Sequence, residues 1–120
     1  MHRVTLPSSA TSAAQSRRFL SAFCRDAGVP VAVADDAVLM VREMVGNAFL
    51  HARSGARLSA SSTSGVLHVE VGDDSPVPPQ LRPASLVTTG GRGVLILDAL
   101  AADWGVRGAL PGKVVWFDVP

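Results

Sequence analysis

Apolar residues recur at helical spacing in the first half of the chain, which predicts two amphipathic helices. The first is expected to begin at the hydroxyl residues of 8–11, which are typical helix caps, and to end near Ala27 because Gly28 follows. The second is expected to run from about 32–35 to about 52. Its predicted core face consists of Val38, Val41, Val45, Ala48, Phe49 and Ala52.

Short segments in which apolar and polar residues alternate predict strands in the second half. Residues 57–63 and 66–73 alternate in this way, and Ser64-Gly65 between them is a hairpin signal. The stretch 74–89 is rich in proline and is predicted to be a loop. The other predicted elements are a strand over 3–6, a helix over 94–102 and a final hairpin of 104–107 and 114–119.

This order of elements, β-α-α-β-β-loop-α-β-β, predicts an α/β two-layer sandwich. Three helices are expected to pack on one face of a mixed, mostly antiparallel sheet. The length of 120 residues and the lack of an internal repeat indicate a single domain over 1–120.

The amino-acid composition limits the partners and the cellular compartment that are expected for the protein. A hydrophobic content of 48% is enough for an ordinary core, and the net charge of +1 gives no electrostatic argument for direct nucleic-acid binding. No apolar run is long enough to span a bilayer, and neither a signal peptide nor membrane association is expected. The lone Cys24 is expected to be a buried thiol. These features together favour a cytoplasmic protein.

Three polar residues lie four positions apart in the second helix: Glu43, Asn47 and His51. This spacing places a carboxylate, an amide and an imidazole on one stripe of a helix. The predicted flanks of the stripe are apolar, namely Leu39, Met40, Met44 and Leu50. A covered site and three incidental polar residues explain the pattern equally well.

Two further motifs are weak when each is taken alone. Asp73 lies where an alternating strand gives way to the proline-rich loop, and its carboxylate can accept a hydrogen bond from an amine or simply begin a turn. Residues 88–93 are rich in glycine and precede a helix, so they can cradle a phosphate or act as a hinge, with Arg92 as a bidentate donor.

Together and in this order, the motifs resemble those of the GHKL (histidine kinase-like) ATPase superfamily, which has the Bergerat fold. Glu43, Asn47 and His51 resemble its N box, and Asp73 resembles the aspartate of its first glycine box. Gly91-Arg92-Gly93 resembles its second glycine box. The small single-domain form is most similar to the anti-sigma factor serine/threonine kinases of bacterial partner-switching modules.

The resemblance implies a role for each of these residues. Asn47 is expected to ligate Mg²⁺, Glu43 to act as general base, and Asp73 to accept the adenine amine of ATP. Gly91 and Gly93 are expected to close on the phosphates with Arg92 nearby. For His51, a ligand contact and packing at the helix end carry equal weight.

The chain departs from the family pattern at two places. Ser75 stands where relatives usually have a glycine beside the nucleotide. The stretch Gly112-Lys113-Val114 lacks the hydroxyl that relatives often use near adenine. Both departures predict a weaker ATP site.

The resemblance implies an Mg-ATP-dependent kinase that phosphorylates an anti-anti-sigma antagonist and sequesters a sigma factor or similar client, with a homodimer as a possible assembly. One alternative is a non-catalytic or nucleotide-gated binding module, and another is the catalytic half of a split two-component kinase. His2 and His68 are interpreted as structural, and Trp104 and Trp116 as core or partner surface.

Overall fold

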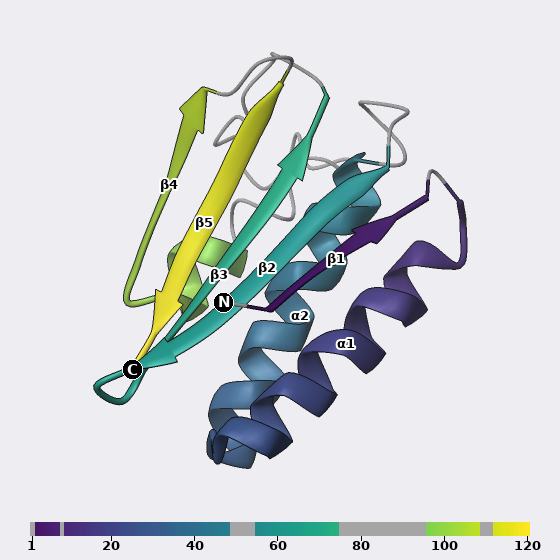
Figure 1. The fold of residues 1–120 in the computed structure, drawn as a ribbon. Helices are drawn as coiled ribbons and strands as arrows, with labels where there is room; N and C mark the ends of the chain where they lie inside the picture. The colour runs from purple at the N-terminus through teal and green to yellow at the C-terminus, as the bar shows by residue number, and fades with distance from the viewer. Residues whose placement is uncertain (1, 8, 49–54, 75–95, 109–111) are drawn as a thin grey trace.

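The computed structural model describes residues 2–7, 9–48, 55–74, 96–108 and 112–120. A five-stranded sheet forms one layer, and the helices cover one of its faces (Figure 1). The strands are ordered β1-β2-β3-β5-β4. Their bounds are β1 His2–Leu6, β2 Ala56–Thr63, β3 Val66–Asp73, β4 Asp103–Gly108 and β5 Lys113–Val119. This architecture confirms the predicted α/β two-layer sandwich.

The strand pairings within the described residues are all antiparallel. The β2–β3 hairpin turns at Ser64 and Gly65, where the sequence predicted a hairpin, and their φ angles of 52° and 80° are the positive values of a tight two-residue turn. β3 lies at the centre of the sheet between β2 and β5, and its Asp73 is opposite Lys113 of β5. The two hairpins were predictable locally, but the β3–β5 pairing joins segments far apart in the sequence.

The first two helices are α1 (Ser12–Ala27) and α2 (Val31–Asn47). Thr11 is the N-cap of α1 but makes no side-chain cap bond; instead its N–H donates to Ser9 Oγ, which corrects part of the predicted capping. Gly28 ends α1 in a left-handed conformation, with φ 73°, as predicted. Residues 96–100 are also helical, within the predicted third helix. The predicted continuation of α2 beyond 48 lies outside the described residues.

The buried side of α2 is broader than the apolar pattern predicted. Val41 and Val45 are buried as expected, but Met40 and Met44, predicted to flank the polar stripe, are also part of the core. Leu39 is 38% exposed. The reason is that α2 packs against α1 as well as against β3 and β5, so two neighbouring arcs of the helix are covered.

The core fills the space between the two layers. It is formed by the inward-facing residues of the strands and the buried arcs of the helices, with Leu20, Met40, Leu58, Leu67, Leu97 and Phe117 among its largest fully buried side chains. Cys24 is free and buried in this core, and burial raises the pKa of its thiol. It therefore matches the predicted inert thiol.

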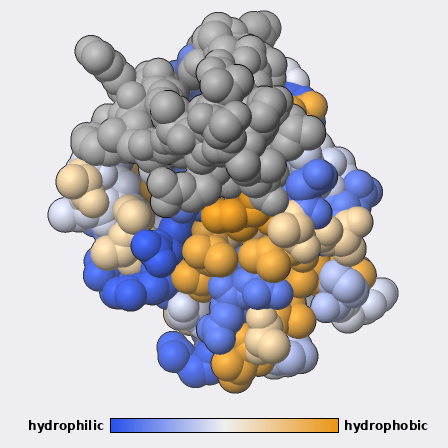
Figure 2. Space-filling view, turned by 180° about the vertical axis from the view of Figure 1, so that it is seen from behind, coloured by the Kyte–Doolittle hydropathy of each residue, from blue (hydrophilic) through white to orange (hydrophobic). Residues whose placement is uncertain are grey.

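The outer surface of the helix layer has an apolar area near its middle (Figure 2). Val31 and Leu39, both on α2, are the exposed large hydrophobic side chains in the part of the chain that the structure describes. None of the helices among the described residues is both long and apolar enough to cross a membrane.

Candidate functional site

Two elements that carry predicted site residues, α2 and β3, come together with β5 at one end of the sheet. β3 ends at Asp73 and β5 begins at Lys113, while α2 packs against both strands and ends at Asn47 (Figure 1). The fold therefore brings the strand-end carboxylate and the polar end of α2 to the same region. The sequence had linked them only through the family resemblance.

Asp73 is a buried carboxylate on the helix-facing side of the sheet. It continues the inward-facing series of Leu67, Val69 and Val71, all buried, and is itself 5% exposed. A buried carboxylate requires a partner, since removal from water is costly for a charge. Asp73 is thus a specific polar position and more than an acidic residue that starts a turn.

The partner of Asp73 is Lys113, directly opposite on β5. The Lys113 Nζ donates to Asp73 Oδ1 at 3.0 Å and to Oδ2 at 2.8 Å. The two side chains are 12% and 7% exposed, for Lys113 and Asp73 in that order. This is a nearly dry ion pair, and it occupies the stretch where the resemblance places a hydroxyl.

A close approach of two backbones fixes the ion pair in place. A Cβ at Gly112 would lie 1.8 Å from the carbonyl oxygen of Asp73, which no side chain can tolerate without a backbone shift. Gly112 therefore lets the start of β5 lie against the end of β3. As a result, Lys113 stands opposite Asp73.

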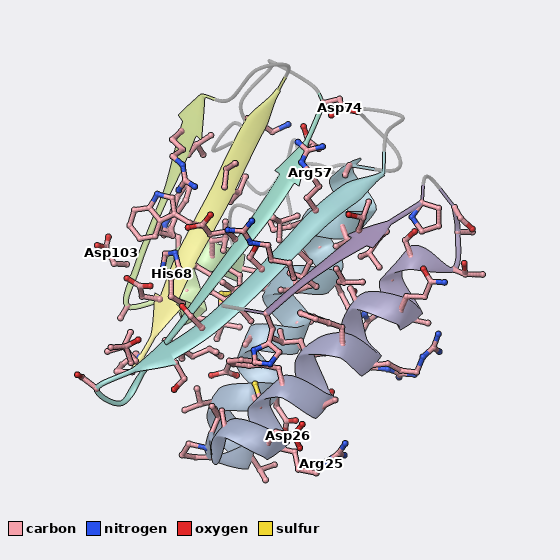
Figure 3. All side chains as sticks on the ribbon, viewed as in Figure 1. Arg25, Asp26, Arg57, His68, Asp74 and Asp103 are labelled. Atoms are coloured by element: carbon pink, nitrogen blue, oxygen red, sulfur yellow. The ribbon has the colours of Figure 1, made fainter. Side chains whose placement is uncertain are left out.

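Arg57 of β2 holds the same strand end from the outer face of the sheet. Its guanidinium donates to the Asp73 carbonyl oxygen at 3.2 Å and to Asp74 Oδ1 at 3.0 Å (Figure 3). A Cβ at Gly72 would come within 3.3 Å of this guanidinium, so glycine gives it room to cross β3. Arg57 thus secures the main chain of the residue whose carboxylate faces inward.

The helix contribution to the site is the end of α2. Glu43 is half-buried, and Asn47, one turn later, is the last residue of the helix. The helical path confirms the spacing of this pair, whereas the side chain of Asn47 is outside the description. Several predicted site residues lie outside the described residues: His51, Ser75, Gly91, Arg92 and Gly93.

The Asp73–Lys113 pair offers a hydrogen-bond acceptor and a hydrogen-bond donor side by side. A buried carboxylate with an adjacent ammonium can accept from one polar edge group and donate to another. No cluster of three or more His, Cys, Asp or Glu side chains suited to a metal ion occurs among the described residues. Mg²⁺ bound through one amide oxygen takes its other ligands from phosphate oxygens and water, so a metal held by Asn47 would depend on a bound nucleotide.

Sequence reasoning missed Lys113 and Arg57 as parts of this site. In the sequence, Lys113 marks only the absence of a hydroxyl, although it is the only lysine of the chain. The missing information was the β3–β5 register, which places it opposite Asp73. A signal was nevertheless present, since a lysine at the start of an otherwise apolar strand requires a partner.

A second charged cluster lies on the outer face of the sheet, turned away from the helices (Figure 3). His68 bonds Asp118 Oδ1 through Nδ1 at 2.5 Å and Glu70 Oε2 through Nε2 at 2.8 Å. Arg107 donates to Glu70 Oε1 at 2.7 Å. The indole of Trp116 stacks on the His68 ring, with centroids 5.9 Å apart. His68, interpreted from the sequence as structural, is thus the centre of an ion-pair network on the outward face.

The network shifts the pKa values of its members in opposite directions. Burial alone would lower the pKa of His68, but the hydrogen bonds and charges of Glu70 and Asp118 outweigh burial and raise it. The hydrogen bond from Arg107 is the main reason that the pKa of Glu70 is lowered. Both shifts favour the charged forms, so the cluster is held by ionic attraction.

The remaining residues interpreted as structural have well-defined places. The imidazole of His2 packs edge-on against Phe23 of α1, with centroids 5.1 Å apart. Trp104 packs partly buried against the core, and its Nε1 donates to Asp98 Oδ1 at 3.1 Å. None of these contacts involves the strand end where Asp73 lies.

Comparison with known proteins places this fold among nucleotide-binding domains. A sequence model of the histidine kinase-like ATPase domain matches residues 6–118. The crystal structure of the RsbU and RsbW domains of Rv1364c from Mycobacterium tuberculosis matches with a TM-score of 0.76 and 16% identity, over 99% of this chain and 32% of that chain. At this identity the match shows the fold alone.

Two matches involve the blue-light activated histidine kinase EL346 of Erythrobacter litoralis, both at 29% identity. One has a TM-score of 0.57 and covers 76% of this chain and 31% of that chain. The match to the histidine kinase domain has a TM-score of 0.59 and covers 95% of this chain and 61% of that chain. No curated protein gives a significant match. The chain thus spans about a third of two of these solved chains and less than two thirds of the other.

Proposed function

Because this chain belongs to the histidine kinase-like ATPase domain family, we propose that it is an Mg-ATP-dependent serine/threonine protein kinase of the anti-sigma factor type. In this proposal, its substrate is an anti-anti-sigma antagonist protein, and its client is a sigma factor or a similar regulator. Phosphorylation of the antagonist frees the protein to hold the client. It acts in the cytoplasm as a single domain over 1–120, and a homodimer is the proposed assembly.

One observation carries the proposal: a buried carboxylate, Asp73, at the end of the central strand, on the side of the sheet where α2 carries Glu43 and Asn47. A base-binding acceptor, a general base and an amide ligand are the minimum that phosphoryl transfer needs from a protein besides a phosphate cradle. The likeness of the fold to an RsbW domain supports the anti-sigma form of the hypothesis.

The proposed roles follow from the chemistry of each group. ATP supplies the phosphoryl group, and Mg²⁺ neutralises charge on the phosphates. Glu43 takes the proton from the substrate hydroxyl as that oxygen bonds to phosphorus and ADP departs. Asn47 would hold the metal through its amide oxygen. Asp73 accepts a hydrogen bond from the adenine amine.

The remaining predicted residues complete the proposed cradle. Gly91 and Gly93 let the backbone approach the phosphates, and Arg92 adds a charge-assisted contact. His51 and Ser75 are assigned to the nucleotide-binding surface. Their contribution is expected to be secondary to that of Asp73, Glu43 and Asn47.

A phosphotransfer assay with a matched control tests the proposal. The purified protein is incubated with labelled Mg-ATP and anti-anti-sigma domain proteins, and the Glu43→Gln variant is compared with Asp35→Asn. Asp35 is an exposed carboxylate two turns earlier on the same helix. We expect Glu43→Gln to lower the transfer rate by roughly 10²–10⁴-fold, the usual contribution of a general base, and Asp35→Asn to leave it unchanged.

Calorimetric titration with a non-hydrolysable ATP analogue separates binding from catalysis. Glu43→Gln is expected to retain ATP binding, whereas Asn47→Ala is expected to weaken the Mg²⁺-dependent part of it. Transfer at the wild-type rate by Glu43→Gln contradicts the catalytic assignment. Transfer to a histidine-containing dimerisation protein, rather than to an antagonist, indicates the split two-component kinase instead.

A second candidate function is a binding module without useful catalysis. The observation that favours it is the ammonium of Lys113, which already contacts both carboxylate oxygens of Asp73. Normal binding of an antagonist together with no detectable ATP binding at millimolar concentration is the result that this candidate predicts.

A further inference from the structure

The Asp73–Lys113 ion pair presents an acceptor and a donor side by side on the inner face of the sheet. The two residues are direct neighbours in the β3–β5 register, and both side chains point to the helix layer. Building on the proposed ATP site, we propose that Lys113 donates a hydrogen bond to ring nitrogen N1 of the base whose 6-amino group Asp73 accepts. The ion pair then recognises the Watson–Crick edge of adenine.

The hydrogen-bonding capacity of the two groups permits this arrangement. A lysine ammonium has three N–H donors, and Nζ of Lys113 lies within 3.0 Å of both Asp73 oxygens, which accounts for two of them. Among the described residues, the third donor of Lys113 has no hydrogen-bond acceptor, although the side chain is nearly dry. A carboxylate offers about four lone-pair sites, so one carboxylate can accept from a lysine ammonium and from a base amine at the same time.

Adenine is complementary to this pair. Its Watson–Crick edge has an amine donor, N6, directly beside an acceptor, N1. An adjacent acceptor and donor on a protein read such an edge bidentately, as a side-chain amide does at the adenine N6 and N7 groups. Here the acceptor and the donor come from two strands, and each fixes the orientation of the other.

Burial is what makes the contact selective. The Lys113 side chain is 12% exposed, so little water competes for its N–H groups. A base that offers no acceptor at position 1 leaves a buried donor unsatisfied, which costs more than the loss of a solvated contact. On this basis, we expect a loss of about tenfold in affinity when N1 is removed from the ligand.

The opposite role for Lys113 is a block, in which the ammonium must leave Asp73 before any base can bind. The two roles predict opposite signs. A donor to N1 strengthens ATP binding, whereas a block weakens it. Recognition of guanine is a further outcome, because O6 and N1–H present the reverse order of acceptor and donor.

The test is a cycle between protein variants and nucleotide analogues, measured by calorimetry with Mg²⁺. The probes are ATP, 1-deaza-ATP, which has C–H in place of N1, and 7-deaza-ATP, which keeps both N1 and the amine. Wild type is expected to bind ATP and 7-deaza-ATP alike and 1-deaza-ATP about tenfold more weakly. In Lys113→Met, the ATP to 1-deaza-ATP ratio is expected to fall to about one.

A double variant guards against the possibility that Lys113→Met does not fold. Lys113→Met leaves the Asp73 carboxylate buried without its counter-charge, so the single variant can fail to fold. The double variant Asp73→Ala/Lys113→Met removes that charge and leaves no side-chain donor at either position that could replace the ammonium at N1. Its ratio for the two analogues is also expected to be about one.

The outcomes separate this inference from the proposed function. If wild type binds ATP and 1-deaza-ATP equally well, the role of Lys113 is overturned while ATP binding itself stands. The same conclusion follows if the ratio of the two affinities is equal in wild type and the double variant. Tighter ATP binding by Lys113→Met shows a block, and a preference of wild type for GTP shows guanine recognition. Absence of any nucleotide binding by wild type removes both the proposed ATP site and this inference.

Discussion

The two faces of the sheet differ in how they arrange charged residues, which lie on β3 and β5 in the inner pair and on β3, β4 and β5 in the outer network. On the inner face, Asp73 and Lys113 form one pair whose side chains are 7% and 12% exposed. On the outer face, the network centred on His68 has side chains that are 20–53% exposed. The inner charges have one arrangement in a dry setting, while the outer charges share partners and remain accessible to water.

The contrast shows which polar residues are expected to carry function. An exposed ion pair adds at most about 1 kcal/mol and tolerates substitution, so its presence says little about a role. A buried pair costs several kcal/mol in desolvation per ion and is often no better for stability than apolar residues. The inner pair is therefore hard to explain by stability alone, which is why a ligand contact is the better explanation for it.

The largest expected effect on stability comes from comparing an inward-facing and an outward-facing residue of the same strand. Phe117 and Trp116 are adjacent on β5, but Phe117 is fully buried in the core and Trp116 is part-exposed on the outer face. We expect Phe117→Ala to lower the free energy of unfolding by about 3–5 kcal/mol, because it opens a cavity between the layers. Trp116→Ala is expected to cost less than half as much. Urea denaturation of both variants measures the difference, and equal losses contradict the assignment of inner and outer faces.

The next largest effect on stability is expected when a cationic side chain is removed from each face of the sheet. Lys113→Met is expected to lower the free energy of unfolding by about 3 kcal/mol, since it leaves a buried carboxylate without its partner. Arg107→Met is expected to cost less than about 1 kcal/mol, because the Arg107 side chain is 53% exposed. Thermal denaturation at matched pH measures both.

The double variant of the inner pair provides the control for this comparison. Asp73→Ala/Lys113→Met is expected to recover a large part of the loss seen in Lys113→Met, since no unpaired charge remains. If the double variant is as unstable as the single one, packing of the lysine stem rather than the buried charge explains the loss.

The elements of the fold and the contacts between them differ in how far the sequence predicts them. The β2–β3 hairpin follows from local alternation and the Ser64-Gly65 turn, and the bounds of β3 were predicted without error. The end of α1 at Gly28 is equally local. Each of these signals acts within a few residues, which is why a pattern along the chain captures them.

Pairings across the sequence were not predictable in the same way. Asp73 and Lys113 are 40 positions apart, and only the β3–β5 register brings them together. The outer network joins His68 to Asp118 over 50 positions for the same reason. The spacing of Glu43 and Asn47 came from helical periodicity, while His51, Ser75, Gly91, Arg92 and Gly93 stay predictions of the family resemblance.

A smaller effect is expected from a single methyl group at each of two glycines. At Gly112, a Cβ would meet the backbone of Asp73 and Asp74, and at Gly105 it would meet the indole of Trp116 at 2.8 Å. Strand backbone cannot yield as an outward-facing side chain can. We expect Gly112→Ala to cost about 2 kcal/mol, within the usual range for overpacking, and Gly105→Ala to cost less.

Nucleotide binding sharpens the glycine comparison. Gly112→Ala shifts Lys113 relative to Asp73, so it is expected to weaken ATP binding, whereas Gly105→Ala leaves the inner face intact. Calorimetry on the two folded variants tests this. Weaker ATP binding by Gly105→Ala alone contradicts the placement of the site on the inner face.

The smallest effect, and the only one expected to depend on pH near neutrality, belongs to the outer face. Because the pKa of His68 is raised on folding, its contribution to stability is fully present below about pH 6.5, its ordinary value, and is lost as the pH rises through the folded pKa. The pKa of Glu70 is lowered on folding, so its carboxylate loses its charge, and the network loses that partner, only as the pH falls through the folded pKa of Glu70.

We expect His68→Gln to lower the free energy of unfolding by up to about 1 kcal/mol at about pH 5.5 and by less at about pH 8.5. Asp118→Asn, which removes one of the two carboxylates on the ring, is expected to reduce this pH dependence, and an unchanged dependence contradicts ionic attraction as the force that holds the outer network.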